Sequence, residues 1–286
     1  MSKRVRIIEV GPRDGLQNEA ETIPTGRKIR LVDTLADCGL KQIEVTGFVS
    51  PRWVPQLADA AEVMSGINRP PGTCFSVLIP NLEGMKRAIR CAPDAVAVLT
   101  SASEGFCQRN INCSIAESLN RIRSVLAFAG DRKMLVRAYI SNVIECPYDG
   151  RVAPAQVARL AHTLLTLGCD EISLGDTIGA GTPDRVDAML AAVLEAVPVT
   201  RLAGHYHNTN GRALDSIKVS LARGLRAFDS AAGGLGGCPF APGAQGNVAT
   251  EQVVQALHEE GYETGIDLEH LTSVAAPLAH GMRSQQ

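Results

Sequence analysis

Short apolar runs recur along the chain, and longer stretches between them carry apolar residues at every third or fourth position. The short runs are typical of buried β-strands and the longer stretches of amphipathic helices. Eight strands are predicted in this way: Val5–Val10, Gln42–Thr46, Thr73–Leu78, Ala95–Leu99, Leu135–Ile140, Glu171–Leu174, Leu202–Tyr206 and Ala227–Ser230. Their starts lie roughly 20–40 residues apart, which leaves room for one helix between parallel neighbours.

Two of the intervening stretches, Val157–Leu165 and Val186–Leu194, show the helical spacing clearly. Alternating strands and helices give either an open doubly wound sheet or a (β/α)8 barrel. Eight strand–helix units in 286 residues favour the barrel. Because no linker is long enough to divide the chain, we predict a single barrel domain over residues 1–286.

The barrel makes a specific demand on the chemistry, because active sites of this fold lie at the C-terminal ends of the strands. Several reactive side chains occupy such positions. They are Arg13 and Asp14 after the first predicted strand, Glu44 near the end of the second, Ser101 after the fourth, Tyr139 at the end of the fifth, Asp176 after the sixth, and His205 and His207 at the end of the seventh. We therefore expect these side chains to share one face of the barrel.

A glycine-rich stretch, residues 233–247, follows the eighth predicted strand and contains one cysteine, Cys238. Glycine loses more backbone entropy on folding than any other residue, so this density indicates a loop that changes shape or lets a substrate approach the backbone. A flexible linker is the alternative, but the helix-like segment Val253–Leu257 holds the far end of the stretch. We predict a catalytic loop in which Cys238 is the reactive group.

The charge balance narrows the classes of function. The formal net charge is −2, which does not suit a general nucleic-acid binder. No apolar run reaches the length of a membrane span, and the N-terminal residues resemble neither a signal peptide nor a transit segment. We therefore expect a cytoplasmic protein without a nucleic-acid or membrane partner. The eight cysteines form no C-x-x-C pair, which argues against a zinc ribbon or a thioredoxin-type motif.

Two histidines, His205 and His207, stand two residues apart in a predicted strand, so their rings point to the same side. Asp14 could add a carboxylate oxygen from the loop after the first strand, and Asn247 an amide oxygen from the end of the glycine-rich stretch. Two nitrogen and two oxygen ligands suit Mg²⁺, Mn²⁺ or Co²⁺. Histidines that merely hydrogen-bond to the backbone are the alternative. We predict a divalent-metal site.

Five motifs carry a family resemblance: Glu9–Glu19 (EVGPRDGLQNE), Phe48–Gln56 (FVSPRWVPQ), Asn110–Ser114 (NINCS), Glu171–Gly179 (EISLGDTIG), and Gly236–Pro239 (GGCP) with the residues through Glu251. Through them the chain resembles the 3-hydroxy-3-methylglutaryl-CoA lyase family over nearly its whole length. The first and fourth motifs occur more widely, in metal-dependent aldolases and acyl-CoA-condensing synthases. The cysteine-bearing loop is specific to the lyase branch.

The resemblance implies a (β/α)8-barrel lyase, often dimeric, that uses Mg²⁺ or Mn²⁺ to cleave 3-hydroxy-3-methylglutaryl-CoA to acetyl-CoA and acetoacetate, as in leucine breakdown. We therefore expect an acyl-CoA substrate and a homodimer. Residue by residue, the resemblance implies metal ligation by Asp14, His205, His207 and Asn247. It implies catalytic roles for Arg13, Asp14, Glu44, His205 and Cys238.

The reaction accounts for these residue types. Cleaving a carbon–carbon bond beta to a thioester leaves an enolate, and a metal on the tertiary alcohol helps that alcohol lose its proton. Asp14 or His205 could accept the proton. Arg13 supplies a permanent charge for the thioester oxygen, or pairs with Glu44, or does both. Cys238 could protonate the enolate, with a buried structural thiol as the alternative.

Further side chains are candidates for substrate contact, together with Arg13. Ser173 and Thr177 could hydrogen-bond the substrate carboxylate, and Tyr139 could line the pocket or simply pack there. Gln17, in the first motif, is also expected to contact the substrate. Asp176 could orient a metal ligand or cap the turn that follows it.

Four positions depart from the pattern common in the family: Ala20 replaces a lysine, Gly47 a serine, Asn208 an aspartate and Asn210 a tyrosine. None of them is a proposed metal ligand. Gly47 lacks a side chain beside the expected pocket, which makes room there. A bulkier 3-hydroxy-3-alkylglutaryl-CoA is therefore an alternative substrate.

Two other functions compete with the lyase. A condensing enzyme of the isopropylmalate synthase type usually carries a further C-terminal region and lacks the Cys-Pro loop. A non-catalytic barrel that only binds acyl-CoA has no need for Asp14, His205, His207 and Cys238 together.

Overall fold

A closed ring of parallel strands forms the centre of the molecule. The computed structural model describes residues 3–19, 21–130, 132–238 and 241–278, and for residues 237–238 and 241–245 it describes the backbone alone. The strands of the ring are β1 (Arg6–Glu9), β2 (Gln42–Gly47), β3 (Cys74–Leu78), β4 (Ala95–Ser101), β5 (Leu135–Ser141), β8 (Glu171–Asp176), β9 (Leu202–Tyr206) and β10 (Ala227–Ser230). They are hydrogen-bonded in the order β1-β10-β9-β8-β5-β4-β3-β2, so β10 lies between β1 and β9. The predicted (β/α)8 barrel is confirmed.

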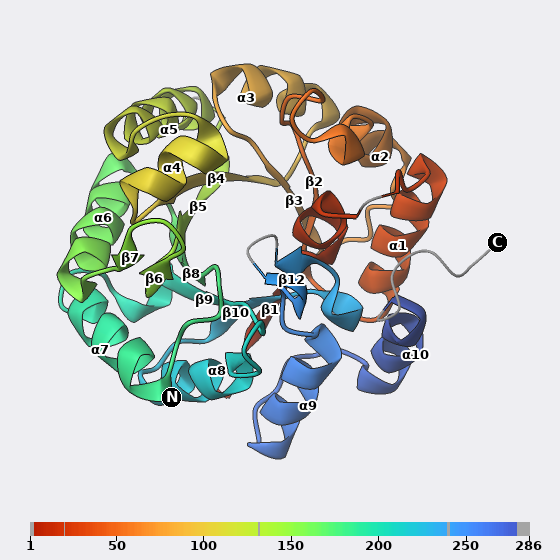
Figure 1. The fold of residues 1–286 in the computed structure, drawn as a ribbon. Coiled ribbons are helices and arrows are strands. Elements are labelled where there is room, and N and C mark those ends of the chain that lie inside the picture. The colour runs from red at the N-terminus through yellow and green to blue at the C-terminus, as the bar shows by residue number, and fades with distance from the viewer. Residues whose placement is uncertain (1–2, 20, 131, 239–240, 279–286) are drawn as a thin grey trace.

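Helices surround the ring, as Figure 1 shows in a view along the barrel. They are α1 (Thr25–Asp37), α2 (Ala60–Gly66), α3 (Leu82–Ala88), α4 (Glu104–Ile111), α5 (Ile115–Gly130), α6 (Pro154–Leu167), α7 (Pro183–Leu194), α8 (Ala213–Ala222), α9 (Thr250–Glu259) and α10 (Leu268–Leu278). Shorter helical turns are η1 (Gly11–Gly15), η2 (Pro55–Leu57), η3 (Ile89–Cys91), η4 (Val199–Arg201) and η5 (Ala232–Gly234). No helix in the described ranges is long and apolar enough to cross a membrane.

The helix α6 shows how the sequence sets these elements. Pro154 stands in its first turn, where a missing backbone N–H costs nothing. Val157, Leu160 and Leu164 share one buried face against the ring. Gly168 follows the helix with φ of 110°, a left-handed conformation that glycine adopts without steric cost.

Alternation along the strands separates the main apolar core from the barrel interior. In β2, Ile43 and Val45 belong to the core between the ring and the helices, whereas Glu44 between them is buried with 1% of its surface exposed. Successive side chains of a strand point to opposite faces, so Glu44 faces the inside of the barrel. A buried charge there needs partners, which the site supplies.

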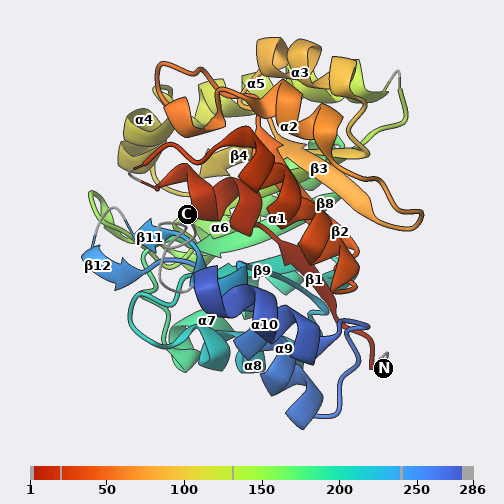
Figure 2. The ribbon, with the colours of Figure 1, turned by 90° about the vertical axis from the view of Figure 1, so that its right-hand side faces the viewer.

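Two hairpins and the helix α10 have no counterpart in the sequence-based prediction. The hairpins are β6 (Glu145–Cys146) with β7 (Gly150–Arg151), and β11 (Gly237–Cys238) with β12 (Ala241–Gln245). Such short strands give no periodic signal. Figure 1 shows β12 across the centre of the barrel, and Figure 2 places β11 and β12 at the end opposite the N-terminus.

The strand ends also differ slightly from the prediction. Ser101 and Asp176 were expected after their strands but are the last residues of β4 and β8. His207 was expected at the end of the seventh strand, and it lies one residue beyond β9. Boundaries of this kind depend on hydrogen bonds to neighbouring strands, which apolar spacing does not report.

Candidate active site

Three predicted metal ligands come together at the C-terminal end of the barrel. Asp14 lies in η1, directly after β1, His205 in β9, and His207 just beyond β9. Each offers a ligand atom within 4.8 Å of the other two. Among the described residues, no other group of three acidic, histidine or cysteine side chains brings its ligand atoms this close together. The Nε2 atoms of His205 and His207 are 3.1 Å apart. Nitrogen and carboxylate donors around one point fit a divalent ion.

The charges of this group match the requirements of metal ligation. Burial lowers the pKa of His207 to about 4, and the nearby His205 adds to the effect, so His207 is neutral near pH 7. Burial opposes ionisation of Asp14, but Arg13 and the two histidines outweigh it and hold the pKa of Asp14 well below its usual range. A neutral imidazole and an ionised carboxylate are the forms that bind metal.

Asn247, the fourth predicted ligand, lies next to the group. It forms an isolated β-bridge with His207, although the two are far apart in sequence. Its amide nitrogen donates to Asp14 Oδ2 at 2.9 Å and to the carbonyl oxygen of Leu235 at 3.2 Å. Because the nitrogen is engaged by these acceptors, the amide oxygen is the atom that a metal would use.

Arg13 is fixed beside the group by two carboxylates. Its Nε donates to Glu44 and its Nη1 to Asp14 Oδ1 at 2.5 Å, and its guanidinium lies 5.6 Å from the centre of the Tyr139 ring. The predicted pairing of Arg13 with Glu44 is therefore present. These carboxylates raise the pKa of Arg13 far above its ordinary value against the opposing effect of burial, so the group is permanently charged. Nη2 has no hydrogen-bond partner among the described residues.

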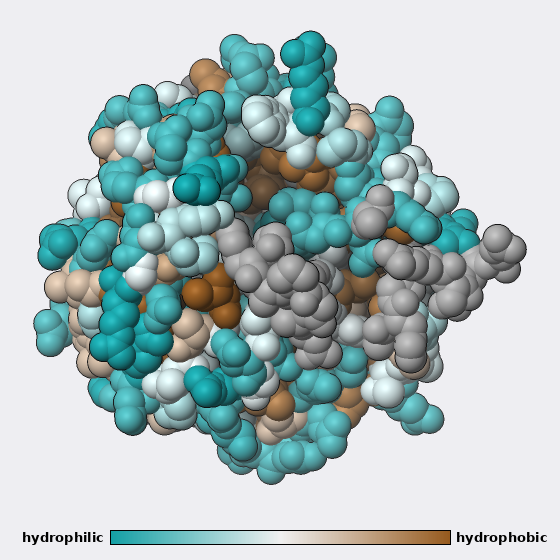
Figure 3. Space-filling view, viewed as in Figure 1, coloured by the Kyte–Doolittle hydropathy of each residue, from teal (hydrophilic) through white to brown (hydrophobic). Residues whose placement is uncertain are grey.

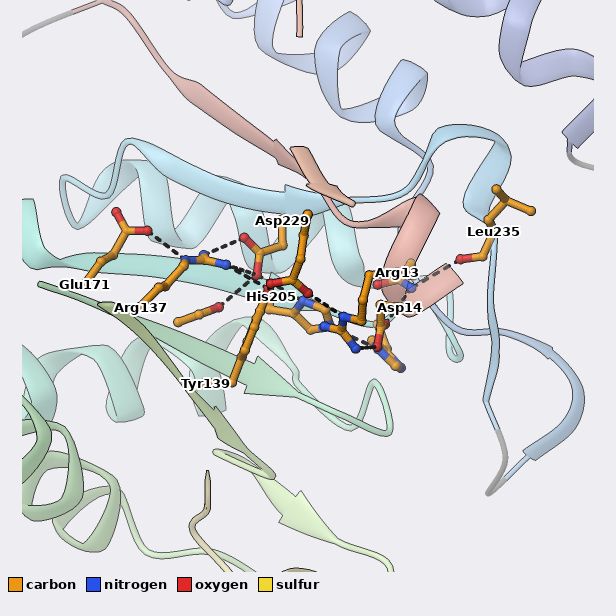
Figure 4. Close-up of polar contacts among 12 residues, drawn as sticks. Arg13, Asp14, Arg137, Tyr139, Glu171, His205, Asp229 and Leu235 are labelled. Carbon is orange, nitrogen blue, oxygen red and sulfur yellow. Dashed lines mark hydrogen bonds and ion pairs between the residues drawn. The ribbon is translucent and has the colours of Figure 1, made fainter. Parts of the chain in front are cut away.

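The predicted substrate-contact residues are placed differently from one another. Tyr139 is buried; its hydroxyl donates to Glu44 Oε2 at 3.1 Å, and its ring lies edge-on to His205. Ser173 is fully buried and donates to Asp229 Oδ2 at 2.9 Å. Thr177 accepts a hydrogen bond from the backbone N–H of Asn142. Gln17 lines a cavity of about 290 Å³ whose wall also includes Trp53. Figure 4 shows Tyr139 beside the group of His205, Arg13 and Asp14.

Asp176 caps the turn after β8. Its carboxylate accepts from the backbone N–H groups of Ala180 at 3.0 Å and Gly181 at 2.7 Å. This is the second of the two roles that the sequence left open for it. The turn leads into the loop before α7 and keeps the C-terminal end of β8 in place.

Two positions of interest fall partly or wholly outside the described residues. Ala20 is not described, and Cys238 is described only by its backbone, as the last residue of β11. Among the other departures, the side-chain oxygen of Asn208 accepts from the N–H of Ala213, and the side chain of Asn210 donates to the carbonyl of Gly179. Both asparagines thus tie down loops beside β9.

Three charged residues inside the barrel were not anticipated from the sequence: the buried Glu9 and Asp229 and the partly buried Arg137. Each lies inside an apolar strand-like run. A charge within such a run is buried only if it is paired, so this position was a usable signal.

Glu9 anchors both ends of the glycine-rich stretch. It accepts hydrogen bonds from the N–H of Gly11 at 2.8 Å, the N–H of Ala232 at 3.0 Å and the hydroxyl of Thr250 at 2.6 Å. Burial raises the pKa of Glu9 to about 7 despite these donors, and Glu251 nearby adds to the rise. The folded protein therefore holds this proton more tightly than the unfolded chain does.

The raised pKa of Glu9 predicts a pH-dependent stability. Its contribution is complete below the ordinary pKa of 4.5 and is lost as the pH rises through about 7. We expect the free energy of unfolding of the wild type, relative to Glu9→Gln, to fall by about 3 kcal/mol between roughly pH 5 and pH 8. Urea unfolding at both pH values measures this, with the exposed Glu83→Gln as control. A difference that does not change with pH would contradict the prediction.

Comparisons with known protein sequences identify relatives of this chain. A protein-family model described as HMGL-like matches residues 4–277. Hydroxymethylglutaryl-CoA lyase, mitochondrial, of Gallus gallus is 52% identical over 98% of this chain and 94% of that protein. The 3-hydroxy-3-isohexenylglutaryl-CoA/hydroxy-methylglutaryl-CoA lyase of Pseudomonas aeruginosa is 52% identical over 95% of this chain and 90% of that protein.

Two solved structures also superpose closely on the structure of this chain. The HMG-CoA lyase of Brucella melitensis superposes with a TM-score of 0.96 at 55% identity, covering 99% of both chains. An HMG-CoA lyase of Acinetobacter baumannii, solved with coenzyme A and 3-methylmalate, has a TM-score of 0.93 at 36% identity, covering 98% of this chain and 92% of that one.

Proposed function

The chain belongs to the HMGL-like family, and we propose that it is a lyase that cleaves 3-hydroxy-3-methylglutaryl-CoA to acetyl-CoA and acetoacetate with Mg²⁺ or Mn²⁺. The observation that carries the proposal is the grouping of Asp14, His205 and His207 beside the Arg13–Glu44 ion pair. Relatives of similar length that are named as such lyases support the choice of reaction.

Asp14, His205, His207 and Asn247 would hold the metal. An ion bound there would lower the pKa of the tertiary alcohol of the substrate and fix its oxygen. Asp14 or His205 would take the proton of that alcohol, since both belong to the group that would hold the metal. Asn247 keeps Asp14 in place through its amide nitrogen.

Arg13 would stabilise the enolate that forms as the carbon–carbon bond breaks. Glu44 and Asp14 hold its Nε and Nη1, so Nη2 can donate to the thioester oxygen as that oxygen gains charge. A donor held in place before the reaction costs no reorganisation when charge develops. Tyr139, hydrogen-bonded to Glu44, keeps this carboxylate from turning away.

Cys238 would deliver the proton that converts the enolate to acetyl-CoA. Its backbone lies in the hairpin β11–β12, and Figure 1 shows β12 across the centre of the barrel. Asn247, two residues after β12, donates to Asp14 of the proposed metal group. A thiol that enters with such a hairpin would act after water has been excluded. Cys238→Ser tests this role, because it should stop turnover while leaving metal affinity unchanged.

Apolar side chains beside β2 favour a second candidate substrate, a 3-hydroxyglutaryl-CoA with a longer 3-alkyl group, although the room expected at Gly47 is taken up by neighbouring side chains. A Cβ added at Gly47 would lie 3.2 Å from Leu57 Cδ1 and 3.5 Å from Leu78 Cβ. Inside the barrel Leu78 packs with Ala97, Tyr139 and Leu99. Figure 3 shows hydrophobic surface in the recess near the centre of this face. One relative is named for both the methyl and the isohexenyl compound.

Gly47→Ser should narrow the substrate range. The added hydroxymethyl group would crowd Leu57 and place a polar atom against leucine side chains. We expect kcat/KM for the isohexenyl substrate to fall by about tenfold or more relative to the methyl substrate, since one or two atoms in an apolar pocket decide this much. Gly130→Ser, where the new side chain meets nothing within 4 Å, is the matched control. An unchanged ratio of the two kcat/KM values would refute the role of Gly47.

Three further proposals concern the domain organisation, the oligomeric state and the cellular location. One barrel domain over residues 1–286 is supported by the continuous match to the family model. The homodimer rests on the resemblance and is measured by light scattering of the purified protein. The cytoplasmic location also remains a proposal, since relatives carry both mitochondrial and cytoplasmic names.

The direct test of the proposed function is product analysis. Purified protein with Mg²⁺ is incubated with 3-hydroxy-3-methylglutaryl-CoA, and acetyl-CoA and acetoacetate are measured. Equal amounts of both products support the lyase. Condensation of added acetyl-CoA with a 2-oxo acid would indicate a synthase instead, and binding without turnover would indicate an acyl-CoA-binding barrel.

A further inference from the structure

A buried carboxylate, Asp229 of β10, lies directly behind the metal group. Its side chain has no exposed surface. Oδ2 of Asp229 is 3.1 Å from Nδ1 of His205, on the side of the ring away from His207. The same oxygen accepts from the hydroxyl of Ser173 at 2.9 Å. Asp229 therefore contacts the imidazole through the one nitrogen that does not face the other ligands.

Arg137 of β5 holds Asp229 with a two-point contact. Its Nη2 donates to Oδ1 of Asp229 at 2.6 Å and its Nη1 to Oδ2 at 3.1 Å. Its Nε donates to Glu171 at 2.8 Å, so the guanidinium is itself fixed on the far side. Figure 4 shows the side chains of Glu171, Arg137, Asp229 and His205 in a row across the barrel interior. A planar guanidinium in this arrangement sets the orientation of the carboxylate as well as its charge.

The contact dictates which nitrogen of His205 carries the proton. A carboxylate can only accept, so Nδ1 of His205 must be the donor. Nε2 then has a lone pair, and it points toward Nε2 of His207 and the carboxylate of Asp14. A carboxylate behind a ligating histidine fixes its tautomer and ring orientation and increases its basicity.

We propose that Asp229 is the positioning residue of His205 and that Arg137 positions Asp229 in turn, so that His205 is held with Nε2 ready for the metal before metal or substrate arrives. The inference rests on the metal site of the proposed function. It adds two residues that the motif-based prediction did not include.

Arg137 also links Asp229 and His205 to the residues that hold Arg13. Its Nη1 also donates to the hydroxyl of Tyr139 at 3.0 Å, and that hydroxyl donates to Glu44, which holds Arg13. One partly buried guanidinium thus supports both the proposed metal ligand His205 and Arg13.

The test uses Asp229→Asn in the full-length protein without substrate. With the asparagine oxygen facing Nη2 of Arg137, its NH₂ group would donate to Nδ1 of His205 and move the ring proton to Nε2. We expect the affinity for Mn²⁺, measured by calorimetry, to fall about 10- to 100-fold. The control is Asp187→Asn, the same change in an exposed ion pair with Arg223. An Mn²⁺ affinity of Asp229→Asn within twofold of the wild type would overturn the proposal, even if the variant is less stable.

A second measurement needs no Asp229 variant and covers the case in which Asp229→Asn does not fold. Nitrogen NMR of wild-type protein with ¹⁵N-labelled histidine distinguishes the two tautomers, and His205→Gln identifies the signals of His205. We expect the proton of His205 on Nδ1 in the metal-free protein. A proton on Nε2 would overturn the proposal. A wild type that binds no Mn²⁺ would count against the proposed metal site instead, and the NMR result would still decide the role of Asp229.

Discussion

Arg13→Lys lowers kcat by about 1,000-fold, with a much smaller change in KM. Lysine keeps the charge but has a single nitrogen, which cannot occupy the separate positions of Nε beside Glu44, Nη1 beside Asp14 and Nη2. Removing one donor from a developing oxyanion typically costs about 10²–10³ in kcat. Here the loss is expected at the upper end of this range, because Glu44 would also lose the hydrogen bond from Nε.

The matched control is Arg223→Lys, which changes an exposed arginine paired with Asp187 on the outside of the barrel. Steady-state kinetics of both variants, with thermal unfolding to confirm that they are folded, measure the effect. A loss of kcat below tenfold in folded Arg13→Lys would show that Arg13 does not stabilise the transition state.

His207→Gln weakens Mn²⁺ binding by at least about 100-fold and removes turnover at ordinary metal concentrations, because it deletes one of the nitrogen ligands of the group. Glutamine has a similar length, and the position lies beyond β9, so the barrel should fold normally. Burial keeps the pKa of His207 near 4, so Mn²⁺ need not displace a proton from it at neutral pH.

Calorimetric titration of Mn²⁺ into metal-free protein measures this effect. His162→Gln is the control, because His162 is exposed on α6, where its Nδ1 lies 3.3 Å from the carbonyl oxygen of Ala196. Activity that returns in His207→Gln at high metal concentration would fit weakened binding. Wild-type affinity in His207→Gln would show that His207 is not a ligand of the metal.

The barrel itself could be predicted from the sequence because its signals are local. Runs such as Ala227–Ser230 and Leu202–Tyr206 coincide with β10 and β9 as the structure has them. Each run is short, buried on both faces and separated by a helix-length segment, which is what a parallel barrel requires. The pair β11–β12 could not be predicted, since β11 has two residues and β12, Ala241–Gln245, shows no apolar alternation.

The candidate site could be predicted only at the ends of strands. Asp14 and the two histidines stand out there as polar residues after apolar runs, and they meet as expected. Asp229 and Arg137 lie within the apolar runs that form strands. They pair with each other across a large distance in sequence, so no local pattern of residues predicts their contact. The roles of Ser173 and Thr177 depend on which neighbour each hydroxyl meets, which spacing along the chain does not determine.

The measurement that tests the account most directly is metal restoration of the cleavage reaction. Protein is freed of metal with a chelator, and Mg²⁺ or Mn²⁺ is added back while acetyl-CoA release from 3-hydroxy-3-methylglutaryl-CoA and metal occupancy are followed together. The account predicts no release without metal and a rate that rises in proportion to occupancy of one site per chain. Release that is unaffected by the chelator, from protein in which no metal is detected, would contradict it.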